Sequence, residues 1–189
     1  MKKKILVTGS SGFIGKNLLP RLLKKRNKIF AILKESKVNK QLSKKINLNY
    51  NNFYPIFFKK NKELNSKLNK INIDVVVNLA TKYIKNHDFT GMLEMINSNI
   101  LFNTAVLESL SKKKLKNFIN LNSMMLHKES NNYRPMNLYA ASKKGFLDIL
   151  KFYKDKYRKV KFQNLTIYDT YGSGDNRVKM IPQIIKKYK

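Results

Sequence analysis

The sequence contains no cysteine and no tryptophan, and only two of its 189 residues are histidines. Without thiols the chain can form neither a disulfide framework nor a thiolate metal site, and two separate imidazoles are too few for a typical zinc centre. The rest of the composition is that of a folded protein, because 42% of the residues are hydrophobic and 11% are aromatic. A chain of this length can bury one substantial core, so we expect one main folded domain.

Acidic residues are scarce, since 11 Asp and Glu stand against 40 Lys and Arg and give a formal charge of +29. Such an imbalance is typical of proteins that bind nucleic acid or an anionic membrane surface. Only five of the cations are arginines, however, and the 35 lysines are spread along the whole chain together with abundant asparagine. Lysine and asparagine share A/T-rich codons, so coding bias explains the charge as well as a binding surface does. We therefore expect no nucleic-acid partner, and a basic nucleic-acid-binding module is kept as an alternative.

Long apolar runs are also missing. No stretch approaches the roughly 18 residues that a membrane-spanning helix needs. The basic opening at residues 1–4 resembles the start of a signal peptide, but the apolar run that follows covers only residues 5–7. We expect a soluble, cytoplasmic protein with no membrane partner.

Short β-type runs alternate along the chain with longer amphipathic segments. The runs that predict buried strands are residues 5–7, 29–33, 53–58, 75–77, 118–121 and 165–168. The segments that predict helices are residues 18–25, 92–110 and 139–157. This alternation indicates a doubly wound α/β domain, a parallel sheet with helices on both faces. The Lys/Asn-rich residues 34–52 and 59–70 lack a clear pattern, and we expect both to be surface loops.

Glycine is rare, with seven in the chain, yet three follow the first predicted strand at a regular spacing. Gly9 would permit a tight turn, Gly12 would let backbone amides approach a pyrophosphate, and Gly15 would let the next helix pack closely on the strand. The pattern predicts a dinucleotide site at this turn. Its candidate cofactor-binding residues are Gly9, Ser11, Gly12, Phe13, Ile14 and Gly15.

The GxxGxxG spacing at residues 9–15 resembles that of the extended short-chain dehydrogenase/reductase family, which comprises sugar-nucleotide epimerases, dehydratases and ketoreductases. Residues 74–81 resemble the family's fourth strand and the Leu-Ala-Ala end beside its cofactor, and Asn99 matches an asparagine of its fourth helix. The resemblance covers essentially the whole chain. It implies an NAD(P)-binding Rossmann domain at residues 1–170, with cofactor contacts that include Leu79, Ala80, Thr81 and Asn99.

Two YxxxK pairs occur, Tyr139 with Lys143 and Tyr157 with Lys161, and only the first lies at the family's spacing from the strand-end Ser123. On a helix, i,i+4 spacing puts Tyr139 and Lys143 on one face. A phenol with an ordinary pKa near 10 needs nearby positive charge to exchange protons at neutral pH, and Lys143 could supply it. The resemblance implies that Tyr139 is the catalytic acid/base, that Lys143 tunes it and binds the cofactor, and that Ser123 is a catalytic residue that anchors the substrate oxygen.

The residues after Ser123 limit which of the family's reactions the chain can be expected to catalyse. Dehydratases of the family carry an Asp-Glu pair there, whereas this chain has Met124 and Met125, which cannot transfer protons. Epimerisation and ketoreduction remain.

The end of the second predicted strand bears on the cofactor. Leu33 occupies the usual acidic position and Lys34 follows it, which favours the 2′-phosphate of NADP, although Glu35 as a displaced acid leaves NAD open. NADP as cofactor would indicate net reduction.

Residues 168–177 resemble the corresponding segment of CDP-abequose and CDP-paratose synthase-like ketoreductases, in which Asp replaces the commoner Asn. Asp169, Arg177 and Ser123 are the candidate substrate-binding residues. We expect NADPH-dependent reduction of a 4-keto-6-deoxy sugar nucleotide. The alternatives are an NAD-dependent nucleotide-sugar epimerase and a non-catalytic NADP-binding domain.

The chain departs from the family in three respects. His127 stands where tyrosine is usual, and the Asp-Leu pair that contacts adenine is absent after Phe58. The family also continues for roughly a hundred residues as a substrate-binding lobe, so we expect residues 171–189 to be the start of a truncated lobe. A homodimer through the helices near residues 92–110 and 139–157 is the expected assembly.

Overall fold

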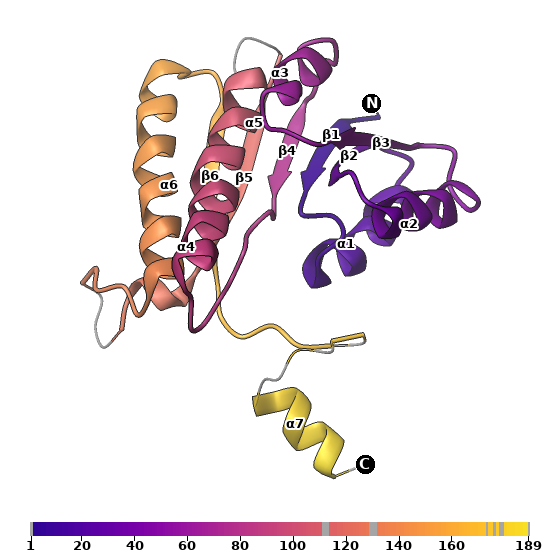
Figure 1. Cartoon of the computed structure of the whole chain (residues 1–189). Helices are drawn as coiled ribbons and strands as arrows, with labels where there is room; N and C mark the ends of the chain where they lie inside the picture. Colours follow the sequence, from indigo (N-terminus) through magenta and orange to yellow (C-terminus); the bar gives the residue numbers. More distant parts are fainter. Residues whose placement is uncertain are drawn as a thin grey trace.

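The computed structural model describes residues 2–110, 114–128, 132–172, 174–175, 177 and 180–188. They form a six-stranded parallel sheet of order β3-β2-β1-β4-β5-β6 (Figure 1). The strands are β1 (Lys4–Thr8), β2 (Lys28–Lys34), β3 (Phe53–Phe58), β4 (Val75–Asn78), β5 (Asn117–Ser123) and β6 (Lys161–Ile167). Strand order reverses between β1 and β4, which confirms the predicted doubly wound α/β fold. Ligands of such sheets bind beyond the carboxyl ends of the strands at this switch point.

Helices cover both faces of the sheet. They are α1 (Phe13–Lys24), α2 (Lys37–Asn47), α3 (Glu63–Leu68), α4 (Phe89–Ile96), α5 (Asn103–Leu110), α6 (Leu138–Lys156) and α7 (Met180–Lys187). β1 shows why both faces are covered, because Ile5 and Val7 pack with residues of α1 whereas Leu6 packs with residues of α3, α5 and α6. Successive side chains of a strand point to opposite faces, so an uninterrupted apolar strand needs a helix layer on each side.

A ladder of polar side chains, buried on β1, β4 and β5 and exposed on β6, crosses four neighbouring strands. Thr8 Oγ1 donates to Asn78 Oδ1 at 2.7 Å, Asn78 Nδ2 donates to Asn120 Oδ1 at 3.0 Å, and Asn120 Nδ2 donates to Asn164 Oδ1 at 2.8 Å. Each pair is also directly opposed in the strand register. A register slip would leave buried polar groups without partners, so the ladder fixes how β1, β4, β5 and β6 align.

Two segments expected to be loops are in fact largely helical. Ser36 begins α2 by accepting a hydrogen bond from the Asn39 amide at 3.1 Å, and such a cap stabilises a helix start. In α3, Leu64 and Leu68 are completely buried in the core. The prediction for residues 34–52 and 59–70 was wrong because the Lys/Asn-rich composition hides a few apolar positions that tertiary packing uses.

The predicted helix 92–110 exists but begins earlier and is not uniform. Asp88 caps α4 by accepting from the Gly91 amide at 2.7 Å. The π-helical turn η1 (Asn97–Phe102) then connects α4 to α5. Such turns are often found at functional sites, and apolar periodicity does not reveal them.

The last strand is longer than expected, and Tyr168 lies beyond its end. β6 is one of the two edge strands of this sheet, and its Leu165 is about half exposed. The chain then extends away from the sheet to α7, which lies apart from the other helices (Figure 1). Met180, Ile184 and Ile185 of α7 are exposed.

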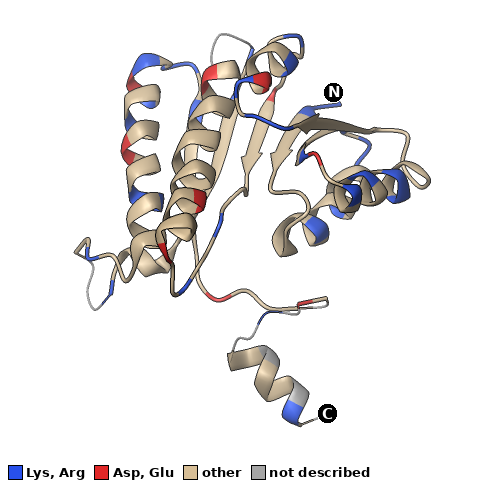
Figure 2. Cartoon of the chain, viewed as in Figure 1, with Lys and Arg blue, Asp and Glu red and all other residues tan. Residues whose placement is uncertain are grey.

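Positive charge is spread over the described surface. Figure 2 shows Lys and Arg on helices of both faces, including α1, α2 and α6. Among the described residues, no helix is long and apolar enough to cross a membrane.

Candidate active site

The turn between β1 and α1 has the geometry of a phosphate loop. Gly9 adopts φ +63°, and a Cβ at this position would lie 2.7 Å from the Ala80 nitrogen. A Cβ at Gly15 would lie 2.6 Å from the Ser10 Cα atom, so the helix can approach the strand this closely only with glycine there. Gly12 is the N-cap residue of α1, and no side chain caps this helix end. The free backbone amides and the positive end of the helix therefore fit an anion such as a pyrophosphate.

A groove of about 840 Å³ lies at the carboxyl ends of the strands, a size within the range of small-molecule sites. The predicted cofactor residues that line it are Gly9, Ser11, Gly12, Phe13, Ile14, Gly15, Lys34, Leu79, Ala80 and Thr81. Arg177, predicted to bind substrate, lines it as well. The pyrophosphate loop, the end of β2 and the end of β4 thus share one cavity, and the residues present fit a dinucleotide.

Several residues that line this groove were not predicted from the sequence. Lys59, Lys60 and Asn61, which follow β3, line it together with Asn39 of α2. Thr90, Leu93 and Glu94 of α4 and Asn97 and Ser98 of η1 line another part. The sequence did contain a signal for the first group. Two lysines follow Phe58, at the position where the family has the Asp-Leu pair that contacts adenine. No motif in the sequence marked the second group, which lies on α4 and η1.

Thr8 fixes the groove floor at the switch point. Its Oγ1 accepts hydrogen bonds from the Leu79 amide at 3.1 Å and the Ala80 amide at 3.0 Å, while it donates to Asn78. The segment after β4 is thereby held directly against Gly9. This contact explains why residues far apart in the sequence line the same groove.

Asn99, predicted to contact the cofactor, lies behind the groove wall instead. Its buried side chain accepts from Thr81 Oγ1 at 3.1 Å and from the Lys82 amide at 2.7 Å. Its Nδ2 donates to the Lys82 carbonyl at 3.0 Å and to Ser142 Oγ at 2.8 Å. Because both ends of the amide are used, Asn99 positions the segment after β4 and ties it to α6.

The structure brings Tyr139, Ser123 and Thr81 together. Asn137 caps α6 by accepting from the Ala140 amide at 2.9 Å, which places Tyr139 in the first helical turn. Tyr139 forms side-chain hydrogen bonds with Thr81 and Ser123, and its ring meets Tyr83 edge to face at 5.1 Å. Ser123 is the last residue of β5 and is nearly buried. Thr81 connects this group to the groove, because it lines the groove and bonds Tyr139.

The expected electrostatic coupling of Tyr139 and Lys143 stays a prediction, since burial is the main influence on the pKa of each group in this structure. Burial raises the pKa of Tyr139, against the opposing effect of its hydrogen bonds with Thr81 and Ser123. Lys143 is 3% exposed, and its ammonium donates to the Leu121 carbonyl at 2.5 Å. Burial lowers the pKa of Lys143 to about 8. The lysine is therefore held beside β5, and desolvation governs both groups.

The remaining candidate site residues are Arg177, which lines the groove, and Asp169. The Arg177 guanidinium stacks over the Phe13 ring at 4.3 Å and is held by Asp175 and by the Thr170 carbonyl. Asp169 is exposed and, within the described part of the chain, is not a wall of the groove. His127, which stands where the family has tyrosine, donates from Nδ1 to the Asn132 carbonyl at 3.0 Å.

We predict that Lys143→Met removes a pH dependence of stability. Since the pKa of Lys143 is about 8 in the folded chain and about 10.5 when unfolded, the folded state binds fewer protons between these values. The free energy of unfolding of the parent protein should therefore rise across this window, by up to about 1.4 kcal/mol per pH unit from this group. Urea denaturation at pH 8 and pH 10 measures the rise. Lys154→Met, at an exposed site on the same helix, should retain the parent slope, and an unchanged slope in Lys143→Met would contradict the prediction.

Comparison with known proteins places this site in a family. Residues 5–189 match the model of the NAD dependent epimerase/dehydratase family. A CDP-abequose synthase of Salmonella muenchen is 32% identical over 197 residues, which cover 100% of this chain and 60% of that relative. The chain spans about 60% of the length of the curated CDP-abequose synthases that it matches.

Solved structures agree on the fold. A UDP-glucuronic acid 4-epimerase from Bacillus cereus in complex with NAD superposes with a TM-score of 0.73 at 23% identity, over 89% of this chain and 57% of that one. The Bordetella bronchiseptica enzyme WbmH in complex with NAD⁺ gives 0.78 at 18% identity, over 100% and 63%. The resemblance inferred from the glycine loop is thus confirmed, and the chain belongs to the NAD dependent epimerase/dehydratase family.

Proposed function

We propose that the protein reduces a nucleotide-sugar ketone, a 4-keto-6-deoxy sugar nucleotide, with NADPH. The observation that carries the cofactor choice is the cationic end of the groove, where Lys34, Lys59 and Lys60 line the wall and Leu33 takes the usual acidic position. Cations there favour the 2′-phosphate of NADP, whereas an acid would hold the ribose hydroxyls of NAD. The substrate class is supported by the CDP-abequose synthase relatives, which are similar to this chain along its whole length.

The glycine loop and the amino end of α1 would hold the pyrophosphate, and the segment after β4 would border the nicotinamide half. A bound reduced nicotinamide supplies hydride to the substrate carbonyl carbon. In this proposal Tyr139 donates its phenolic proton to the carbonyl oxygen, and Ser123 orients that oxygen. The phenol of Tyr139 is protonated at neutral pH, so it holds the proton that this step transfers. We retain Asp169 and Arg177 as candidate substrate contacts at the open side of the groove.

The proposal predicts a preference for NADP that depends on Lys34. Lys34→Asp should weaken NADP⁺ binding to the chain by roughly tenfold, since repulsion of the 2′-phosphate replaces attraction, and NAD⁺ binding should change less. Calorimetric titration with each nucleotide measures both affinities. Lys44→Asp makes the same charge change at an exposed site on α2 and should have little effect. Equal affinity of the parent chain for both nucleotides, or NAD retained through purification, would instead favour the epimerase alternative.

Tyr139→Phe removes the proposed proton donor and little else. In the protein encoded by the complete reading frame, it should lower NADPH oxidation with a CDP-4-keto-6-deoxy sugar by roughly 10²- to 10⁴-fold and leave NADP⁺ affinity nearly unchanged. Tyr157→Phe is the matched control, because Tyr157 belongs to the other YxxxK pair and stacks on Tyr153 away from Ser123. Loss of activity in Tyr157→Phe alone would overturn the assignment.

We also propose that two copies associate through the predicted helices near residues 92–110 and 139–157. Leu101 of η1 and Phe152 of α6 are about half exposed there, and such exposed apolar side chains favour association. Light scattering should give twice the chain mass of 22.2 kDa. A monomer at high micromolar concentration would contradict the dimer.

A further inference from the structure

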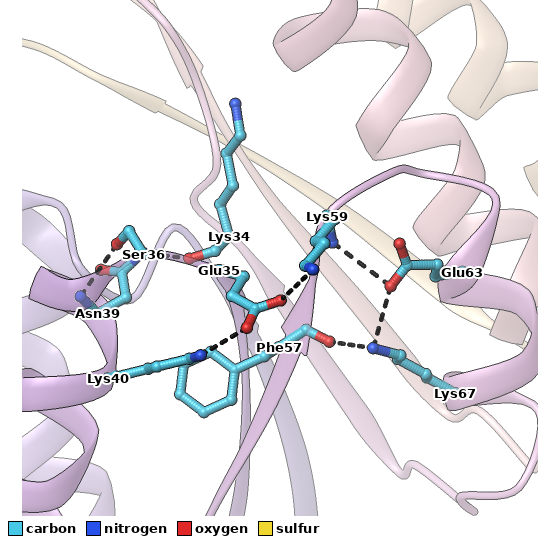
Figure 3. Close-up of polar contacts among 9 residues, drawn as sticks. All are labelled: Lys34, Glu35, Ser36, Asn39, Lys40, Phe57, Lys59, Glu63 and Lys67. Atoms are coloured by element: carbon cyan, nitrogen blue, oxygen red, sulfur yellow. Dashed lines mark hydrogen bonds and ion pairs between the residues drawn. The ribbon is translucent and has the colours of Figure 1, made fainter.

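The acid that follows β2 is turned away from the groove. Glu35 continues the β2 ladder by donating its amide to the Phe58 carbonyl at 2.8 Å, so it stands next to the groove-lining Lys34. Yet Glu35 is not among the residues that line the groove. Figure 3 shows its carboxylate directed toward Lys40 and Lys59, whereas the Lys34 side chain extends in another direction. The one acid that could bind ribose hydroxyls at this strand end therefore faces elsewhere.

Two lysines hold Glu35 in that orientation. Its Oε1 lies 2.5 Å from Lys40 Nζ, and its Oε2 lies 3.8 Å from Lys59 Nζ. The hydrogen bond from Lys40 is the main reason that the pKa of Glu35 is lowered, so the carboxylate is ionised at neutral pH. Lys40 is the closer partner, and it does not line the groove itself.

The start of α2 places Lys40 beside Glu35. Ser36 caps the helix, and Asn39 Nδ2 donates to the Lys34 carbonyl at 2.7 Å. This bond joins the helix directly to the end of β2, as Figure 3 shows. The orientation of Lys34 and the position of Lys40 thus depend on the same helix start.

A second ion pair fixes the opposite wall. The Glu63 carboxylate accepts from the Lys60 amide at 3.1 Å and pairs with Lys67 Nζ at 3.1 Å. Lys67 also donates to the Phe57 carbonyl. The segment after β3 is held in place, so Lys59 can pair with Glu35 (Figure 3). Lys59 and Lys60 both line the groove.

We propose that Lys40 is a positioning residue for cofactor specificity: it holds the Glu35 carboxylate away from the adenosine end of the groove and so preserves the preference for NADP. Without this pair, Glu35 could turn toward the groove, where it would repel a 2′-phosphate and accept hydrogen bonds from ribose hydroxyls. The inference rests on the proposed function in one respect, that NADP binds in this groove.

A double-mutant cycle on the 189-residue chain tests this role, with NADP⁺ and NAD⁺ affinities measured by calorimetry. Lys40→Met should lower the ratio of NADP⁺ to NAD⁺ affinity roughly three- to fivefold, a size suited to an exposed ion pair. Lys40→Arg should keep the parent ratio because it retains the charge. In a Glu35→Gln background, Lys40→Met should have no effect on the ratio. Lys44→Met removes the same charge from an exposed site one turn further along α2 and is the matched control.

The same fall in Lys44→Met, or in the Glu35→Gln background, would show a general charge effect and overturn the role of Lys40. An unchanged ratio of NADP⁺ to NAD⁺ affinity in Lys40→Met would also overturn the role of Lys40. The proposed function would still stand in that case if Lys34→Asp weakened NADP⁺ binding. Failure of the parent chain to bind either nucleotide would overturn both.

Discussion

The shape of the groove depends on the hydrogen bonds of the Thr8 hydroxyl. It donates to Asn78 on the neighbouring strand and accepts from the two amides that follow that strand. One buried side chain therefore aligns β1 with β4 and holds residues 79 and 80 against the glycine loop. The asparagine ladder extends the same alignment through β5 to β6. Such buried networks specify one arrangement because every alternative leaves polar groups without partners. The switch point, the glycine loop and the end of β5 that carries Ser123 are thus parts of one connected framework.

Desolvation dominates around Tyr139 and Lys143, whereas ion pairing dominates around Glu35. Near Tyr139 and Lys143, burial sets the protonation behaviour: it raises the pKa of the phenol and lowers that of the ammonium. Near Lys34, exposed ion pairs join the Glu35 carboxylate to Lys40 and Lys59. The first arrangement suits proton transfer in a dry environment. The second suits selection between two cofactors that differ by one phosphate, because few-fold preferences need only modest electrostatic differences.

The sequence predicted the features that have strong local signals. The three glycines, the buried strands and the long helix of Tyr139 each follow from spacing or periodicity, and the structure has the strands and helices near the predicted positions. Helices α2 and α3 were not predicted because their sequences are rich in lysine and contain few apolar residues. Their helical structure depends on the burial of Leu64 and Leu68 and on the Ser36 cap. Whether Lys143 contacts Tyr139 could not be read from i,i+4 spacing, which defines a shared helix face and says nothing of the Leu121 carbonyl that holds the ammonium. The orientation of Glu35 depends on residues of α2 and of the segment after β3, so it too needed the fold.

The central claim is that a dinucleotide occupies the groove at the β1–β4 switch point with its adenosine end toward Lys34. An NMR titration of the chain with NADP⁺ tests it directly. The account predicts amide shifts at Gly12, Phe13 and Ile14 of the loop and at Lys34 and Lys60. The amino ends of the strands provide an internal comparison, because a second cavity of about 490 Å³ there is lined by Lys2, Lys24, Arg26 and residues 49–52. Shifts confined to that second cavity, with the glycine loop unchanged, would show nonspecific anion binding to a basic surface and would contradict the account.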